Sequence, residues 1–153
     1  FSERFGHTAV MTACGEDLPE EHNRIVLDPI LKDSNGIPAP KVFYKMSENS
    51  RKLMDHGVMS ATTVLKAAGA KEVLVNPLVR STGWHLLGTA RMGSDSDKSV
   101  VDAYGRAHDV KNLFIIDGSI FVTAGAVIPT STIQALALYI ADYFKETPNH
   151  MLG

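Results

Sequence analysis

The feature that most constrains the fold of this chain is a helix pattern near its carboxyl end that is apolar almost all round. Pro129 ends the preceding segment, and Ser131 followed by Gln134 has the spacing of a capping box, so we predict a helix from about Ser131 to Phe144. A helix that is apolar on nearly every face belongs in a protein interior, so its first N–H groups are buried and need partners. The apolar positions are Ile133, Ala135, Leu136, Ala137, Leu138, Ile140, Ala141 and Phe144.

Two kinds of partner can satisfy those N–H groups. The hydroxyls of Thr130, Ser131 and Thr132 can cap the helix from within the chain. Alternatively, a bound group whose carbonyl gains negative charge can accept from them, because the helix dipole stabilises negative charge at this end. The sequence alone leaves both alternatives open.

A short apolar run lies upstream of this helix and ends in a polar turn. Leu113–Ile116 contains no polar residue, which is typical of a central strand buried on both faces. Asp117 and Gly118 follow at its carboxyl end, where open α/β sheets collect ligands. Gly118 would let a ligand approach the backbone and Asp117 would offer a carboxylate. The simpler alternative is a turn that only terminates the strand.

His85 is the candidate catalytic residue. It lies between Trp84 and the apolar pair Leu86-Leu87, and we expect an imidazole in such surroundings to stay neutral, as a general base must. A lone histidine of this kind is also commonly a hydrogen-bonded structural residue, and that alternative stays open. The remaining histidines show no metal-ligand spacing and receive no role: His7, His22, His56, His108 and His150.

Composition narrows the remaining function classes. The 153 residues suit one soluble domain, and a net charge of −2 with no cluster of Lys or Arg argues against a nucleic-acid partner. No apolar run is long enough to span a bilayer. The single cysteine, Cys14, excludes an internal disulfide, and the compartment, cytoplasmic or periplasmic, stays open. Because Phe1-Ser2-Glu3 is neither an initiator methionine nor a signal peptide, we expect a fragment.

The first half of the chain predicts a hairpin followed by a helix. Residues 24–27 and 41–45 are the predicted strands, and Asn35-Gly36 supplies the tight turn between them. Ser47 is placed to cap a helix that runs to about Ala68. Further short strands are predicted over residues 8–12 and 73–75. No linker divides the chain into autonomous domains.

Several motifs occur together in a fixed order along the chain. In the second half they are His85-x-x-Gly88-Thr89-x-Arg91-Met92-Gly93, Val100-Val101-Asp102, Arg106-x-His108-Asp109-Val110-x-Asn112-Leu113, Asp117-Gly118-Ser119 and Pro129-Thr130-x-Thr132-Ile133-Gln134-Ala135. In the first half they are Asn23–Pro29, Lys32-Asp33-x-x-Gly36-x-Pro38 and Ala67-Ala68-Gly69-Ala70. Together these motifs resemble the carboxyl-terminal part of the glucose-methanol-choline (GMC) flavin oxidoreductases, closest to the bacterial sugar and polyol dehydrogenases among them.

The resemblance implies a fold and a cofactor. The chain would be the carboxyl-terminal fragment of a two-domain FAD-dependent oxidoreductase, α/β with an α+β substrate-binding layer. Several of its strands would pair with a missing amino-terminal FAD-binding segment. Residues 1–80 would be part of the substrate-binding domain, and residues 81–153 the catalytic and FAD-contacting segment of the same structural unit.

The resemblance also implies roles for individual residues. His85 would take the hydroxyl proton of an alcohol, sugar or polyol as hydride passes from the carbinol carbon to N5 of the flavin. Asp117 and Gly118 would contact FAD near its ribityl-pyrophosphate portion. The backbone amides of Thr130 and Ser131 would contact the pyrimidine edge of the flavin, which carries the hydride chemistry.

Two departures from the family pattern favour a different class of function. The chain has no Gly-x-Gly-x-x-Gly turn, so the ADP half of FAD has no cradle within it. The family places Asn or His immediately before the proline of its last motif, as partner of the catalytic histidine, whereas this chain has Ile128 before Pro129. These departures favour a catalytically impaired or non-catalytic binding module that kept the scaffold, while His85 and Asp117-Gly118 favour an enzyme.

Overall fold

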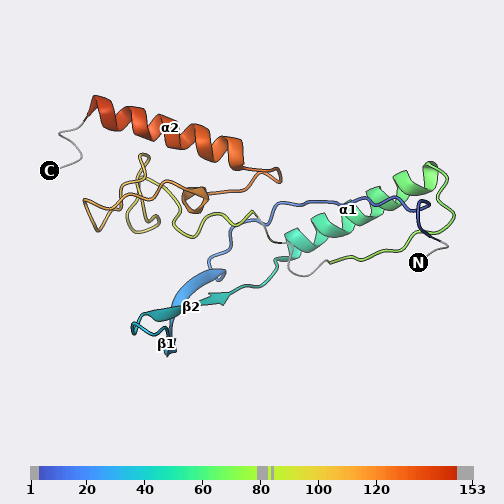
Figure 1. Cartoon of the computed structure of the whole chain (residues 1–153), viewed down its shortest axis with the longest axis horizontal. Helices are drawn as coiled ribbons and strands as arrows, with labels where there is room; N and C mark the ends of the chain where they lie inside the picture. The colour runs from blue at the N-terminus through green and yellow to red at the C-terminus, as the bar shows by residue number, and fades with distance from the viewer. Residues whose placement is uncertain (1–3, 79–82, 84, 148–153) are drawn as a thin grey trace.

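The computed structural model describes residues 4–78, 83 and 85–147 of the chain. Along this part the elements are β1 (Arg24–Lys32), β2 (Pro38–Phe43), α1 (Glu48–Ala67), the 3-10 turn η1 (Gly118–Ile120) and α2 (Thr130–Glu146). Helix α2 lies across the top of the irregular segment 85–121, and the hairpin and α1 lie below and beside it (Figure 1). Trp84, His150 and the division expected between residues 80 and 81 fall outside the described residues.

The predicted hairpin is confirmed, because β1 and β2 pair in antiparallel orientation as a two-stranded sheet. Strand β1 continues through Asp28-Pro29, beyond the point where the sequence pattern ended it. The Asp28 Oδ1 accepts the N–H groups of Ile30 at 2.8 Å and Leu31 at 2.9 Å. These bonds support the chain across Pro29, which lacks an N–H, and the pairing register shifts over the same stretch.

Helix α1 begins where predicted, since the Ser47 Oγ accepts the N–H of Ser50 at 3.1 Å. The segment that precedes the hairpin runs alongside this helix (Figure 1). A Cβ added to Gly57 would lie 2.7 Å from the Cβ of Ala13, closer than real Cβ contacts. A glycine at position 57 lowers the helix propensity of α1, but it allows the segment that carries Ala13 to approach the helix closely.

The core lies in the second half of the chain, beneath α2. Its neighbouring segments are joined by isolated bridges instead of a sheet, and Phe114 pairs with Arg106 alone in this way. The prediction of a central buried strand over Leu113–Ile116 is therefore wrong: Leu113 is 47% exposed. Residues 8–12 and 73–75 also form no strand. The fully or nearly fully buried apolar residues are Val101, Ala107, Ile120 and Ile140.

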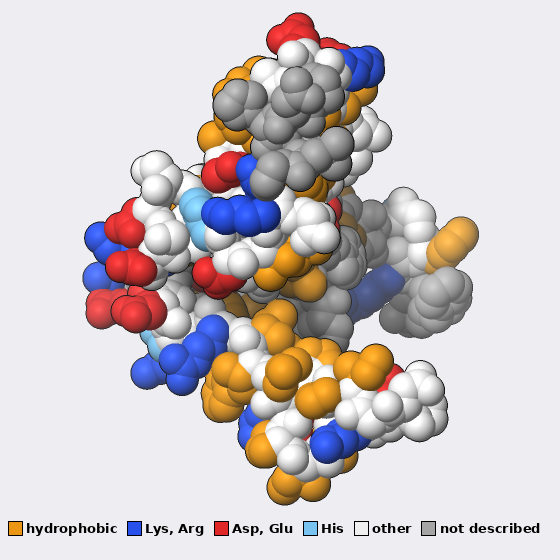
Figure 2. Space-filling view, turned by 90° about the vertical axis from the view of Figure 1, so that its left-hand side faces the viewer, with side chains coloured by type: hydrophobic (Ala, Val, Ile, Leu, Met, Phe, Trp, Pro, Cys, Tyr) orange, Lys and Arg blue, Asp and Glu red, His pale blue; other side chains and the backbone are white. Residues whose placement is uncertain are grey.

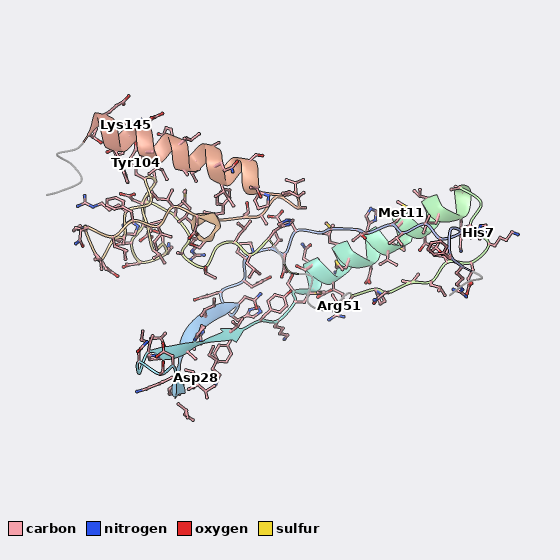
Figure 3. The ribbon with its side chains drawn as sticks, in the orientation of Figure 1. His7, Met11, Asp28, Arg51, Tyr104 and Lys145 are labelled. Carbon is pink, nitrogen blue, oxygen red and sulfur yellow. The ribbon has the colours of Figure 1, made fainter. Side chains whose placement is uncertain are left out.

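The α2 helix is not buried as its composition predicts. Leu138 is 68% and Tyr139 is 58% exposed, while Ile140 packs into the core. Tyr104 lies beneath the helix (Figure 3). Its ring stacks on that of Tyr143, with ring centroids 3.5 Å apart. Hydrophobic side chains also gather on the hairpin, at the bottom of Figure 2. Apolar faces of this kind are usually buried against another protein surface, and the described residues leave these two exposed.

None of the helices in the described part of the chain is both long and apolar enough to cross a membrane.

Candidate functional site

The segments that carry the site residues meet beneath the first turns of α2. Met92 donates its N–H to the carbonyl of Ile120 at 2.8 Å, so residues 86–92 lie alongside the turn that follows Asp117. The helix packs on the same place, because a Cβ on Gly118 would lie 3.2 Å from the Cδ1 of Ile133. The structure thus brings together three motifs that are separate in the sequence.

Asp117 shapes the turn between these segments. Its Oδ1 accepts the N–H of Ser119 at 2.7 Å and caps η1. Hydrogen bonds from Ser119, first from its hydroxyl and then from its N–H, lower the pKa of Asp117 below the ordinary value of a carboxyl group. The carboxylate is exposed, so an ionised acceptor is available at this edge of the site.

Gly118 allows close packing within the protein. A Cβ at this position would lie 2.7 Å from the Cδ2 of Leu87 and 3.5 Å from the carbonyl oxygen of Leu86. The groups that approach the Gly118 backbone from the Cβ side are therefore these protein atoms. They lock the segment that follows His85 against the turn that Asp117 caps.

His85 is exposed, and so is Leu86, at 81%. The described residues do not supply the apolar surroundings expected for this imidazole, since both His85 and Leu86 are exposed. The backbone is nevertheless fixed two residues later, where Leu87 meets Gly118. An exposed imidazole on a fixed backbone can take a proton from a molecule bound beside it.

The start of α2 differs from the predicted capping box. The helix begins at Thr130, one residue earlier than expected, and its N-cap is Pro129, which makes no side-chain capping bond. Ser131 therefore lies inside the first turn, where its hydroxyl is not in the N-cap position. Thr130 and Ser131 are exposed. The first N–H groups of a helix have no acceptor within the helix, so they can donate to an acceptor placed at this end.

An apolar groove of about 420 Å³ runs beside this helix start. Sequence reasoning missed the lining residues Phe121, Val122 and Thr123, because the groove forms only when the loop after η1 folds back onto α2. Two threonines supply its polar edge. The mainly apolar lining suits a flat ring system, and the exposed residues Thr130 and Ser131 lie at the adjoining start of the helix. The lining residues are Met92, Phe121, Val122, Thr123, Thr132, Ala135 and Leu136.

The loop between the groove and α2 carries an unusual backbone. Gly125 has φ +72° and Ala126 has φ +56°, so the left-handed conformation extends to a residue that has a Cβ. Ile128 follows and is 72% exposed. The Ile128 side chain therefore faces outward in the part of the chain that the structure describes.

The family model and the similar known proteins agree on one family. The model of the family described as GMC oxidoreductase matches residues 19–137. The chain is 44% identical over 149 residues to the 2-methyl-1,2-propanediol dehydrogenase of Mycolicibacterium austroafricanum, covering 95% of this chain and 26% of that protein. It is 37% identical over 139 residues to the fructose dehydrogenase large subunit of Gluconobacter japonicus, covering 91% of this chain and 25% of that subunit.

Among solved structures, the chain is similar to pyridoxine 4-oxidase from Mesorbium loti. The TM-score is 0.60 at 24% sequence identity, covering 74% of this chain and 26% of that one. At this identity the likeness shows the fold alone. The chain spans about a quarter of the length of the curated relatives it matches.

Proposed function

Because the chain belongs to the GMC oxidoreductase family, we propose that it forms the carboxyl-terminal part of an FAD-dependent enzyme that oxidises an alcohol, sugar or polyol. The observation that carries the proposal is the start of α2, where the exposed residues Thr130 and Ser131 adjoin an apolar groove and the segment that bears His85. The names of two relatives, a propanediol dehydrogenase and a fructose dehydrogenase subunit, agree with a hydroxyl-bearing substrate.

Each site residue then has a role. The amides of Thr130 and Ser131 hold the pyrimidine edge of the flavin, and the turn of Asp117 and Gly118 faces the ribityl-pyrophosphate portion. When bound, FAD supplies the acceptor for the hydride of the carbinol carbon. His85 accepts the hydroxyl proton at a ring nitrogen, so the substrate oxygen carries negative charge as hydride leaves.

The proposed division of the protein follows. Residues 1–80 form part of a substrate-binding domain in an α/β and α+β architecture, and residues 81–153 form the catalytic and FAD-contacting segment of the same unit. An amino-terminal segment would supply the dinucleotide turn and cover the exposed apolar faces of the hairpin and α2.

A non-catalytic binding module is the second candidate, and Ile128 is the observation that favours it. One experiment separates the two. The chain is produced together with an amino-terminal FAD-binding segment of the family, and the visible spectrum is recorded under anaerobic conditions while alcohols and sugars are added. The enzyme predicts a flavin spectrum that bleaches with at least one of these compounds. A flavin-loaded protein that none of them bleaches supports the binding module.

A further inference from the structure

Two consecutive acidic residues, Glu16 and Asp17, join elements that are far apart in the sequence. The Glu16 Oε1 accepts the N–H of Ala124 at 3.0 Å, across 108 positions of the chain. Asp17 accepts the hydroxyl of Tyr44 on Oδ2 and the hydroxyl of Ser50 on Oδ1, each at 2.6 Å. The pair therefore links the residue after β2, the first turn of α1 and the loop that leads into α2.

The Asp17 end of this link is firmly held. Ser50 is only 4% exposed. Partial burial and then the Asp17 carboxylate raise the pKa of Tyr44 to about 12, so its hydroxyl keeps the proton it donates. A Cβ on Gly15 would lie 2.9 Å from the Cδ2 of Leu53, so the backbone just before Glu16 lies directly against α1. Glu16 thus presents its carboxylate from a fixed support.

The Ala124 end of the link is the loop that needs support. Val122 and Thr123, just before Ala124, line the apolar groove beside α2. Ala126, two residues after it, has φ +56°, a left-handed conformation that is unfavourable for a residue with a Cβ. Such a backbone persists only where its surroundings hold it. The charge-assisted bond from Ala124 to Glu16 is a contact that can do so.

We propose that Glu16 is a positioning residue for the proposed reaction, which this inference presupposes. By accepting the Ala124 N–H it fixes the loop 122–128, and with it one wall of the groove and the side chain of Ile128, relative to the start of α2. Glu16 contacts the loop and not the reacting atoms. A residue of the proposed substrate-binding part (1–80) thereby determines the position of a loop in the proposed FAD-contacting part (81–153).

The contact itself is tested by amide hydrogen exchange of residues 122–128 in the 153-residue chain. The variants are Glu16→Ala, Glu16→Gln, whose amide oxygen still accepts a hydrogen bond, and Glu21→Ala as a control at an exposed glutamate nearby. We expect exchange to rise about tenfold in Glu16→Ala and to stay within about twofold of the parent in the other two. Unchanged exchange in Glu16→Ala, or equally fast exchange in Glu16→Gln, overturns the proposal.

Its consequence is tested in the flavin-loaded protein that includes the amino-terminal segment. Glu16→Ala should slow flavin reduction by substrate about tenfold at saturation, and Glu16→Gln should restore the rate, with thermal midpoints equal to that of Glu21→Ala. If the parent reduces its flavin but Glu16→Ala reduces it equally fast, the positioning role is wrong. If the parent itself is not reduced by any alcohol or sugar, the proposed function fails, and the exchange measurement still decides whether Glu16 holds the loop.

Discussion

The N–H of Ala90 donates to the carbonyl of Ser119 at 2.9 Å, and this bond places the segment that bears His85 beside the turn that Asp117 caps. The bond joins main-chain atoms, so it does not depend on the side chains of either site residue. Substitutions at His85 and Asp117 should therefore change chemistry or local capping without separating the two segments. That independence is what makes the site testable residue by residue.

Gly105 gives a direct test of the packing beneath α2. Its φ is +75°, and a Cβ would lie 2.5 Å from the carbonyl oxygen of Ile115. Gly36 has a similar φ of +83° with nothing within 4 Å of its Cβ position, which makes it a matched control. Gly36→Ala should cost about 1–2 kcal/mol for the backbone alone.

Gly105→Ala should cost about 1–3 kcal/mol more, because the Ile115 carbonyl must also move. Chemical denaturation of the parent and both variants measures the difference. Equal losses in the two variants would mean that the backbone around Ile115 relaxes freely.

The lowered pKa of Asp117 predicts how the folding stability of the chain depends on pH. Its pKa in the folded chain lies below the ordinary value, so its contribution is fully present above about pH 4 and is lost as pH falls through the lowered pKa. Asp117→Ala should lower the thermal midpoint by about 2–4 °C at neutral pH, the usual scale of a lost cap, and by less in acid. Midpoints of parent and variant that stay equally far apart from neutral pH into acid would contradict this linkage.

The parts of the fold that depend on neighbouring residues were predictable from sequence. The Asn35-Gly36 turn, the Ser47 cap and the apolar spacing of α1 act over a few positions, and the hairpin and α1 follow from them. Leu113–Ile116 shows the opposite case. A central strand needs partner strands on both sides. The apolar run Leu113–Ile116 does not contain the information whether the rest of the chain supplies them.

Errors at the site have the same origin. The apolar residue that follows His85 in the sequence does not bury it, since both His85 and Leu86 are exposed. The Ser131 and Gln134 spacing matched a capping box, but Pro129 continues the helical turn backwards with φ −85° and ψ −4°, and so takes the N-cap position. Phe121 lines the groove because of the path of the loop that carries it, and no local sequence pattern predicts that path.

The chain by itself should bind FAD poorly. It offers the exposed start of α2 and the groove, but no Gly-x-Gly-x-x-Gly turn for the pyrophosphate. Isothermal titration calorimetry of the 153-residue chain with FAD should therefore show only weak binding. Submicromolar affinity would show that this argument is wrong.

Ile128→Asn tests the departure from the family pattern. In the proposed mechanism an amide here would supply a hydrogen-bonding partner for the proton that His85 accepts, and it should raise the rate of flavin reduction in the loaded protein. Because Ile128 is largely exposed in the described chain, stability of the 153-residue chain should change by no more than about 0.5 kcal/mol. A variant that reduces its flavin no faster than the parent would mean that position 128 does not face the substrate.

The role of His85 is measured most directly by anaerobic stopped-flow reduction of the flavin in the protein that carries both this chain and the amino-terminal FAD-binding segment. His56, on the exposed side of α1, provides the control histidine. His85→Ala should reduce its flavin at least about 10²-fold more slowly than the parent while keeping FAD bound, and His56→Ala should match the parent. A His85→Ala variant that retains FAD and is reduced within a few-fold of the parent rate would contradict general-base catalysis by His85.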